Sequence, residues 1–159
     1  MKLSSETLSV LKNFASINTG LEFKKDSNVI KTISAGKNIL AEATLKDTFP
    51  DDFCVYDLNQ FLSVHSLFKD PDLVFDDYNV IFESGRSKTK YRKTAKEMII
   101  TPPDKELTLK QVDCKFSLPN SVLQKFLKIA QMNNLPNLTV LGKNGELRLK
   151  IHEKANDTS

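Results

Sequence analysis

The feature that most constrains this fold is the alternation of amphipathic helical segments with short strand-like runs. Residues 4–17 place Leu8, Leu11, Phe14 and Ala15 at helical spacing. The opposite side of this segment carries Ser5, Ser9, Lys12 and Ser16. Apolar residues on one side and polar residues on the other predict a surface helix packed on a core, with Ser4 or Ser5 as its cap.

Two further segments have the same character. Asp57 is expected to cap a second helix, whose apolar side consists of Leu58, Phe61, Leu62, His65 and Phe68. Residues 117–119 open a third helix, whose expected buried side consists of Val122, Leu123, Phe126, Leu127 and Ala130.

Short runs rich in β-forming residues fill most of the remaining sequence. Strands are expected at 21–24, 29–33, 38–45, 53–56, 73–75, 79–82, 86–92, 98–101, 112–116, 137–141 and 146–151. Polar breaks between the early runs are typical of an antiparallel meander, and Asn144-Gly145 is a strong hairpin signal. The fold class expected is therefore α+β.

An internal repeat suggests two similar domains. Ser-Val-Leu-x-x-Phe begins at Ser9 and again at Ser121, so that Val10 and Val122 are separated by 112 positions. The prediction is a first domain at 1–101, a polar linker at 102–110 and a second domain at 111–159. A second unit of equal length would extend to about residue 224, so we expect the second domain to be incomplete.

Composition narrows the class of protein without naming a function. The formal net charge is +3, too small to establish a polyanionic partner by itself. Cys54 and Cys114 lack the spacing of a metal or redox motif, which favours a reducing cytoplasm. No signal peptide or membrane span is evident, so a soluble, intracellular protein is expected.

No catalytic or metal-binding set assembles from the sequence. His65 falls on an apolar helix side, and His152 has no partner at metal-ligand spacing. The glycines occur singly and form no phosphate-binding loop. We therefore expect a protein that is not an enzyme and needs no cofactor.

Lysines on helix surfaces are the remaining candidates for a function. Lys12 opposes the apolar side of the first helix, and Lys125 and Lys128 share one side of the third. Taken alone, such lysines more often solvate a helix than bind a ligand. The basic run at 86–92 is interpreted first as an edge strand that uses like charges to discourage aggregation, with a nucleic-acid ribbon as the alternative.

Three segments resemble the T-even-type bacteriophage sliding clamps, which are DNA polymerase processivity factors. They are Met1-Lys-Leu-Ser4, residues 11–20 and residues 55–62. The resemblance covers the whole chain but is weak between about residue 70 and residue 115, where mainly the order of elements corresponds. It implies a DNA-clamp fold with antiparallel outer sheets and inner helices, one full domain and the first part of a second.

The resemblance also implies a function and partners. In the full-length family member, a homotrimeric ring would encircle double-stranded DNA without sequence preference and tether the replicative DNA polymerase, after opening by an ATP-dependent clamp loader. Such clamps sometimes also support late transcription. The location implied is the cytoplasm of an infected bacterial host. The alternative is an α+β protein-interaction domain that does not bind DNA.

The resemblance assigns roles to individual residues. Lys12, Lys125 and Lys128, with Lys2 as a weaker candidate, correspond to DNA-facing positions of the inner helices. Met98, Ile99 and Ile100 correspond to an edge strand at the subunit interface. A hydrophobic pocket for partner peptides is implied near the linker, but no residue is assigned to it.

Overall fold

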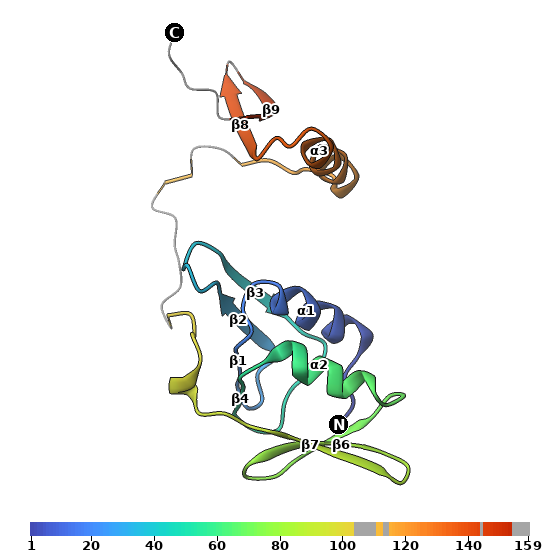
Figure 1. Ribbon diagram of the computed structural model, residues 1–159. Helices are drawn as coiled ribbons and strands as arrows, with labels where there is room; N and C mark the ends of the chain where they lie inside the picture. Colours follow the sequence, from blue (N-terminus) through green and yellow to red (C-terminus); the bar gives the residue numbers. More distant parts are fainter. Residues whose placement is uncertain (104–110, 113–114, 144, 154–159) are drawn as a thin grey trace. The chain divides into compact units, whose positions relative to one another are not determined.

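The computed structural model describes residues 1–103, 111–112, 115–143 and 145–153 of the chain. They belong to two compact units, Met1–Glu106 and Leu107–Ser159 (Figure 1). The helices and strands of the first unit are α1 Ser5–Ala15, β1 Leu21–Phe23, β2 Val29–Ile33, β3 Leu40–Thr44, β4 Phe53–Val55, α2 Leu58–Ser66, β5 Asp72–Phe75, β6 Asn79–Ser84 and β7 Ser87–Arg92. Those of the second are α3 Asn120–Met132, β8 Asn137–Lys143 and β9 Glu146–His152. The expected α+β class with antiparallel sheets is confirmed.

Side-chain caps fix where the first two helices begin. The Ser4 hydroxyl accepts a hydrogen bond from the backbone N–H of Thr7 at 3.2 Å, and the Asp57 carboxylate accepts one from that of Gln60 at 3.1 Å. Each bond satisfies an amide that has no partner within its helix. Asp47 supports the start of α1 by accepting from the Ser4 backbone N–H at 2.7 Å. Both capping predictions are confirmed.

The strands of the first unit pair differently from a simple meander. β1 pairs with β4, β2 pairs with β3, and β5, β6 and β7 form a three-stranded sheet, all antiparallel. The expected meander is therefore wrong at β1, which pairs with β4 and not with β2. At the turn between β1 and β2 the chain bridges to Phe49 through Lys25, and the Lys25 N–H donates to Asp52 at 2.7 Å. Both contacts direct β1 toward the segment that leads into β4.

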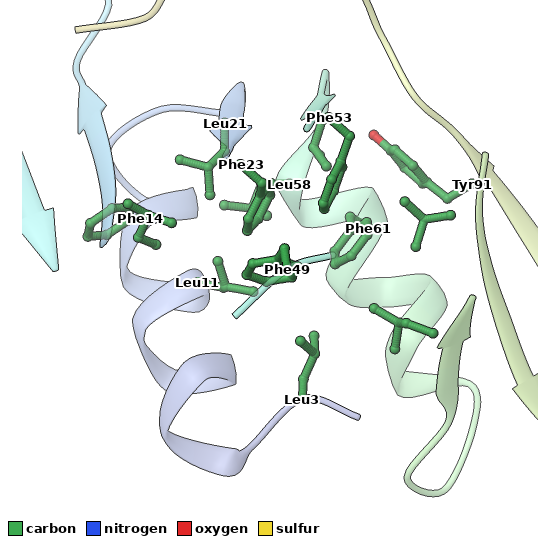
Figure 2. Packing of buried hydrophobic residues seen from close by; sticks show 14 of the residues in the cluster. Leu3, Leu11, Phe14, Leu21, Phe23, Phe49, Phe53, Leu58, Phe61 and Tyr91 are labelled. Atoms are coloured by element: carbon green, nitrogen blue, oxygen red, sulfur yellow. The ribbon is translucent and has the colours of Figure 1, made fainter. Parts of the chain in front are cut away.

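Phenylalanine rings form the centre of the first unit (Figure 2). Phe23 stacks on Phe53 with ring centroids 4.5 Å apart, and Phe49 packs on Phe23 at the same separation. Phe61 of α2 meets Phe82 of β6 edge to face at 5.1 Å. Offset and edge-to-face ring pairs add stability beyond the burial of their area. The core thus links the helices to the sheets behind them.

The expected strand at Met98–Thr101 is wrong. A short 3-10 helix, Lys96–Met98, occupies its beginning. Ile99 lies so close to Gly20 that a Cβ at that glycine would be 2.8 Å from the Ile99 Cβ. The side-chain amide of Asn18 also donates to the Ile100 carbonyl at 2.9 Å. These contacts with the segment after α1 hold the chain in place without a strand ladder.

The second unit consists of one helix and one hairpin. Pro119, at the N-cap of α3, provides no side-chain hydrogen bond. β8 and β9 pair from Asn137 with His152 to Lys143 with Glu146, which confirms the hairpin. None of the described residues of α3 is buried. Leu127 is 48% exposed and Phe126 is half-buried, so the prediction that both are core residues is wrong. The expected strand at 112–116 includes residues outside the described part.

Candidate nucleic-acid interface

Helices α1 and α2 lie side by side in the first unit (Figure 1) and pack against each other. Their inner sides bury Leu11, Phe14, Leu58 and Phe61 in the core. Their outer sides form a surface, called here the polar helix face, that consists of Ser5, Ser9, Lys12, Ser16, Asn59, Ser63 and Ser66. All of these side chains are exposed, and all but one are uncharged.

Three of the five serine hydroxyls on this face, those of Ser16, Ser63 and Ser66, donate back to carbonyls of the preceding turn. Ser16 donates to the Asn13 carbonyl at 2.6 Å, and Ser63 donates to the Asn59 carbonyl at 2.8 Å. With its proton engaged, each hydroxyl keeps an oxygen that can accept a hydrogen bond from water. The face is therefore well hydrated and offers few fixed donors that could read the edges of DNA bases.

Lys12 is the one cation of the polar helix face. Glu6, the exposed acid in the first turn of α1, is neutralised by a salt bridge to Lys46 at 2.8 Å. His65 is half-buried on α2, and burial lowers its pKa. The Asp70 carboxylate opposes this shift, and the positive charge of Lys12 adds to it more weakly. A face with an unopposed cation and no unpaired acid can attract phosphate without sequence preference.

Lys2 has a partner that the sequence did not suggest. Its ammonium group donates to Asp70 at 2.6 Å, and this hydrogen bond raises the pKa of Lys2. Both side chains are exposed, at 49% and 63%. A phosphate would have to compete with the Asp70 carboxylate, so Lys2 is less available to a polyanion than Lys12.

Lys125 and Lys128 are exposed on the polar side of α3. Neither has a salt bridge to another described residue, so both charges are available. Val122, Leu123, Phe126 and Ala130 are half-buried on the other side of the helix. The separation of lysines from apolar residues is as expected, although no contact identifies what the lysines bind.

The three residues assigned to a subunit interface have different environments. Met98 is 64% exposed and Ile100 is 44% exposed, whereas Ile99 is half-buried against Gly20. Two apolar side chains thus lie on the surface just before the segment expected to be a linker. Their assignment to an interface stays a prediction.

A small cavity of about 160 Å³ lies beside the first residues of the expected linker. Its walls are Glu22, Lys24, Ser27, Val29, Lys31, Pro102 and Pro103. Glu22, Lys24 and Lys31 bring charged groups to the lining, and Val29 and the two prolines bring apolar ones. The partner-peptide pocket expected near the linker stays a prediction. In the sequence, the signal near this cavity was Pro102-Pro103, at the start of the linker expected at 102–110.

Other site classes find no support in the described part of the chain. No group of three or more His, Cys, Asp or Glu side chains there could hold a metal ion. Burial raises the pKa of the Cys54 thiol to about 11, which keeps it protonated and unreactive at neutral pH. Within the same residues, every helix is too short or too polar to cross a bilayer.

Comparison with known proteins gives one consistent result. The family described as DNA polymerase processivity factor matches residues 3–101. The chain is 30% identical to the sliding clamp of Escherichia phage RB69 over 160 residues, which cover 99% of this chain and 69% of that protein. It is 30% identical to the sliding clamp of Vibrio phage KVP40, covering 95% of this chain and 69% of the relative. The sliding clamp of Enterobacteria phage T4 is 28% identical, over 100% of this chain and 70% of its own length. The matched family region contains the whole polar helix face.

Proposed function

The chain belongs to the family of DNA polymerase processivity factors, and we propose that it performs this role by encircling duplex DNA with the polar helix face toward the DNA. Its role in phage DNA replication is that of a sliding clamp. The proposal that the polar helix face is turned toward the DNA rests on one observation. Helices α1 and α2 together form an exposed polar surface that carries an unopposed cation, Lys12.

The chemistry of this layer suits a surface that must hold DNA without stopping on it. Phosphate attraction is independent of base sequence and weakens as salt rises, because counterions compete for the same charges. Serine and asparagine side chains add hydrogen bonds that water can replace at little cost. A hydrated face with few cations therefore permits movement along the duplex.

Further parts of the proposal extend beyond the first unit. Lys125 and Lys128 would present α3 to DNA in the same way, as members of a second domain at 111–159 that follows a linker at 102–110. Exposed Met98 and Ile100, with anchored Ile99, would take part in contacts between subunits of a homotrimer. Lys2 would make a minor contribution, since Asp70 already engages its charge.

The proposed partners are double-stranded DNA, the replicative polymerase and an ATP-dependent clamp loader. The family is one of accessory proteins, and a tether needs no catalytic residue. A tether of this kind would raise the processivity of the polymerase by keeping it at a high local concentration on its template. Late transcription, which the resemblance also implies, stays a prediction.

Retention on circular DNA tests encirclement directly. A form of the protein with a complete second domain would be loaded on a nicked circular duplex with a phage clamp loader and ATP, and the protein that remains would be measured before and after one cut linearises the DNA. We expect retention on the circle and loss after the cut, and blocking the new ends should restore retention. Equal retention with free ends would contradict encirclement and favour an open DNA-binding surface.

A charge variant connects the same assay to the polar helix face. Lys12→Gln removes its one cation, so retention should be lower and its salt dependence shallower. Lys37→Gln makes the same change at an exposed position outside this face and is the matched control. If the two variants behave alike, Lys12 has no special part in DNA binding. No DNA binding by the unchanged chain would favour the protein-interaction alternative.

A further inference from the structure

The outer edge of β7 has unpaired backbone groups. A two-residue turn joins β6 to β7, with Ser84 paired to Ser87 and Gly85 at φ 60°, the conformation that a type II′ turn requires at this position. Hydrogen-bonded pairs alternate along such a hairpin. The backbone groups of the odd-numbered residues of β7 therefore form hydrogen bonds with β6. Lys93 continues this alternation, because its N–H donates to the Tyr78 carbonyl at 2.8 Å. The residues whose N–H and C=O groups point outward are Lys88, Lys90 and Arg92.

No other described strand covers this edge. The sheet order is β5-β6-β7, which places β7 at the margin. After Arg92 the chain leaves this sheet, and Thr94 pairs with Cys54 of β4. An open length of strand thus remains between the turn at Gly85 and the bridge at Thr94, and such an edge can accept another extended chain.

The same residues present their charges on one side of the sheet. Lys88, Lys90 and Arg92 are all exposed, and alternate residues of a strand recur about every 7 Å. Lys88 forms a salt bridge with Glu83 of β6 at 2.6 Å. Lys90 lies opposite Ile81, and neither Lys90 nor Arg92 has a salt bridge to another described residue. Two cations that have no salt bridge to another described residue therefore lie along the open edge, and Lys90 also interacts electrostatically with the Asp76 carboxylate.

A groove runs between this edge and α2. It has a volume of about 390 Å³ and is lined by Tyr56, Gln60, Val64, Lys90, Tyr91, Arg92, Lys93 and Thr94. Tyr56 is 58% exposed, so its ring is available to a ligand. The Tyr91 hydroxyl donates to the Asp57 carbonyl at 3.1 Å and thereby fixes β7 relative to the start of α2. The groove is consequently preformed.

We propose that this edge, with its groove, binds an extended acidic segment of a partner protein as an added β-strand. The backbone of the segment would bond to the outward N–H and C=O groups of Lys88, Lys90 and Arg92. Carboxylates at every second position would lie beside Lys90 and Arg92 and would compete with Glu83 for Lys88. The alternate side chains would enter the groove near Tyr56 and Val64. The spacing of these carboxylates would match the spacing of the cations, because alternate side chains are equally spaced along any β-strand.

Charge explains how an open edge can be selective. Lysines on an exposed edge repel basic strands, and an uncharged strand would desolvate them without pairing their charge, which protects the protein from unwanted pairing. The same charges favour a segment that carries acids in register. A nucleic acid strand would satisfy the cations but not the backbone edge, and only Tyr56 offers an exposed ring in the groove. The geometry therefore favours a peptide over single-stranded DNA.

Peptide binding to the full 159-residue chain tests the proposal. The probe is a short fluorescent peptide in which Glu alternates with Thr, measured by fluorescence anisotropy. A comparison peptide has the same residues with all Glu in one block, and a labelled oligothymidylate represents nucleic acid. We expect the alternating peptide to bind tightest. Lys90→Glu and Arg92→Glu should each weaken it on the order of tenfold, while Lys37→Glu should leave it unchanged.

A second pair of variants separates strand addition from simple attraction of charges. Lys90→Gln removes the charge, and Lys90→Pro removes the outward N–H as well; proline is tolerated at an edge position whose N–H faces solvent. Circular dichroism would verify that both variants fold. We expect Lys90→Pro to bind several-fold more weakly than Lys90→Gln. Equal binding by these variants, or by the alternating and blocked peptides, would overturn strand addition, and tighter binding of the oligothymidylate would show a nucleic-acid site. The edge is separate from the polar helix face, so any of these results leaves the clamp proposal standing.

Discussion

Helices α1 and α3 share the pattern Ser-Val-Leu-x-x-Phe, yet their environments differ. In α1 the leucine and phenylalanine of the pattern, Leu11 and Phe14, are 0% and 3% exposed. In α3 the equivalent Leu123 and Phe126 are only half-buried. An apolar helix side thus predicts that a helix forms, but burial depends on the elements that cover it.

The covering elements explain the difference. The inner side of α1 meets α2 and the ring cluster around Phe23, Phe49 and Phe53, which closes the core of the first unit (Figure 2). The described elements of the second unit are α3 and the hairpin β8–β9, whose exposed apolar residues are Leu138, Val140, Leu141 and Leu147. A two-stranded hairpin with one helix provides too few layers to enclose a core.

The largest test of this comparison removes the phenylalanine from each helix. Phe14→Ala should lower the free energy of unfolding of the first unit by about 3–5 kcal/mol, because a fully buried ring leaves a cavity. Phe126→Ala should cost less than about 1.5 kcal/mol, since a half-buried ring loses less contact. Urea unfolding followed by near-ultraviolet circular dichroism would measure both. Equal losses would mean that α3 is covered as completely as α1.

The helix caps provide a smaller test. Ser4→Ala and Asp57→Ala each remove a bond to a helix amide and should each destabilise the first unit by about 1 kcal/mol. Ser117→Ala, just before α3, is the comparison, because no side chain caps that helix. We expect it to change the free energy of unfolding by no more than a few tenths of a kcal/mol. A cost at Ser117 similar to that at Ser4 would show that α3 has a cap in solution.

Local features of the fold were predictable from the sequence, but the pairing and packing of segments far apart in the chain were not. The caps at Ser4 and Asp57 and the hairpin of β8 with β9 depend on residues close by in the sequence, so their patterns identify them. The pairing of β1 with β4 and the packing of Ile99 against Gly20 depend on segments far apart in the sequence. A strand period alone does not show which edge a strand will join.

In the candidate site too, features set by nearby residues were predictable, and features set by distant residues were not. The exposure of Lys12, Lys125 and Lys128 was predictable, because helical spacing places each opposite an apolar side. The salt bridge of Lys2 with Asp70 was not, since it joins residues 68 positions apart. The outward backbone of Lys90 also required the observed register of β6 and β7.

Histidine titration gives the smallest expected effect and reports on the first unit alone. The pKa of His65 is lowered below its ordinary value of 6.5 by burial and, more weakly, by Lys12, against the opposing effect of Asp70. In the window between the folded pKa and 6.5 the unfolded chain binds more protons, so stability falls as pH decreases through that window. His65→Gln should reduce this dependence. Lys12→Gln should raise the pKa of His65 in an NMR titration, and an unchanged or lower pKa would contradict the proximity of the two charges.

The orientation of the polar helix face is the central claim, and site-specific crosslinking tests it most directly. A photo-crosslinker would be attached to cysteine in Ser9→Cys or Ser63→Cys on that face, and in Lys37→Cys as a control outside it, each in a Cys54→Ala, Cys114→Ala background. With the protein loaded on circular duplex, we predict crosslinks to DNA from positions 9 and 63 and little or none from position 37. Equal crosslinking from all three positions, or crosslinks from position 37 alone, would contradict the proposed orientation.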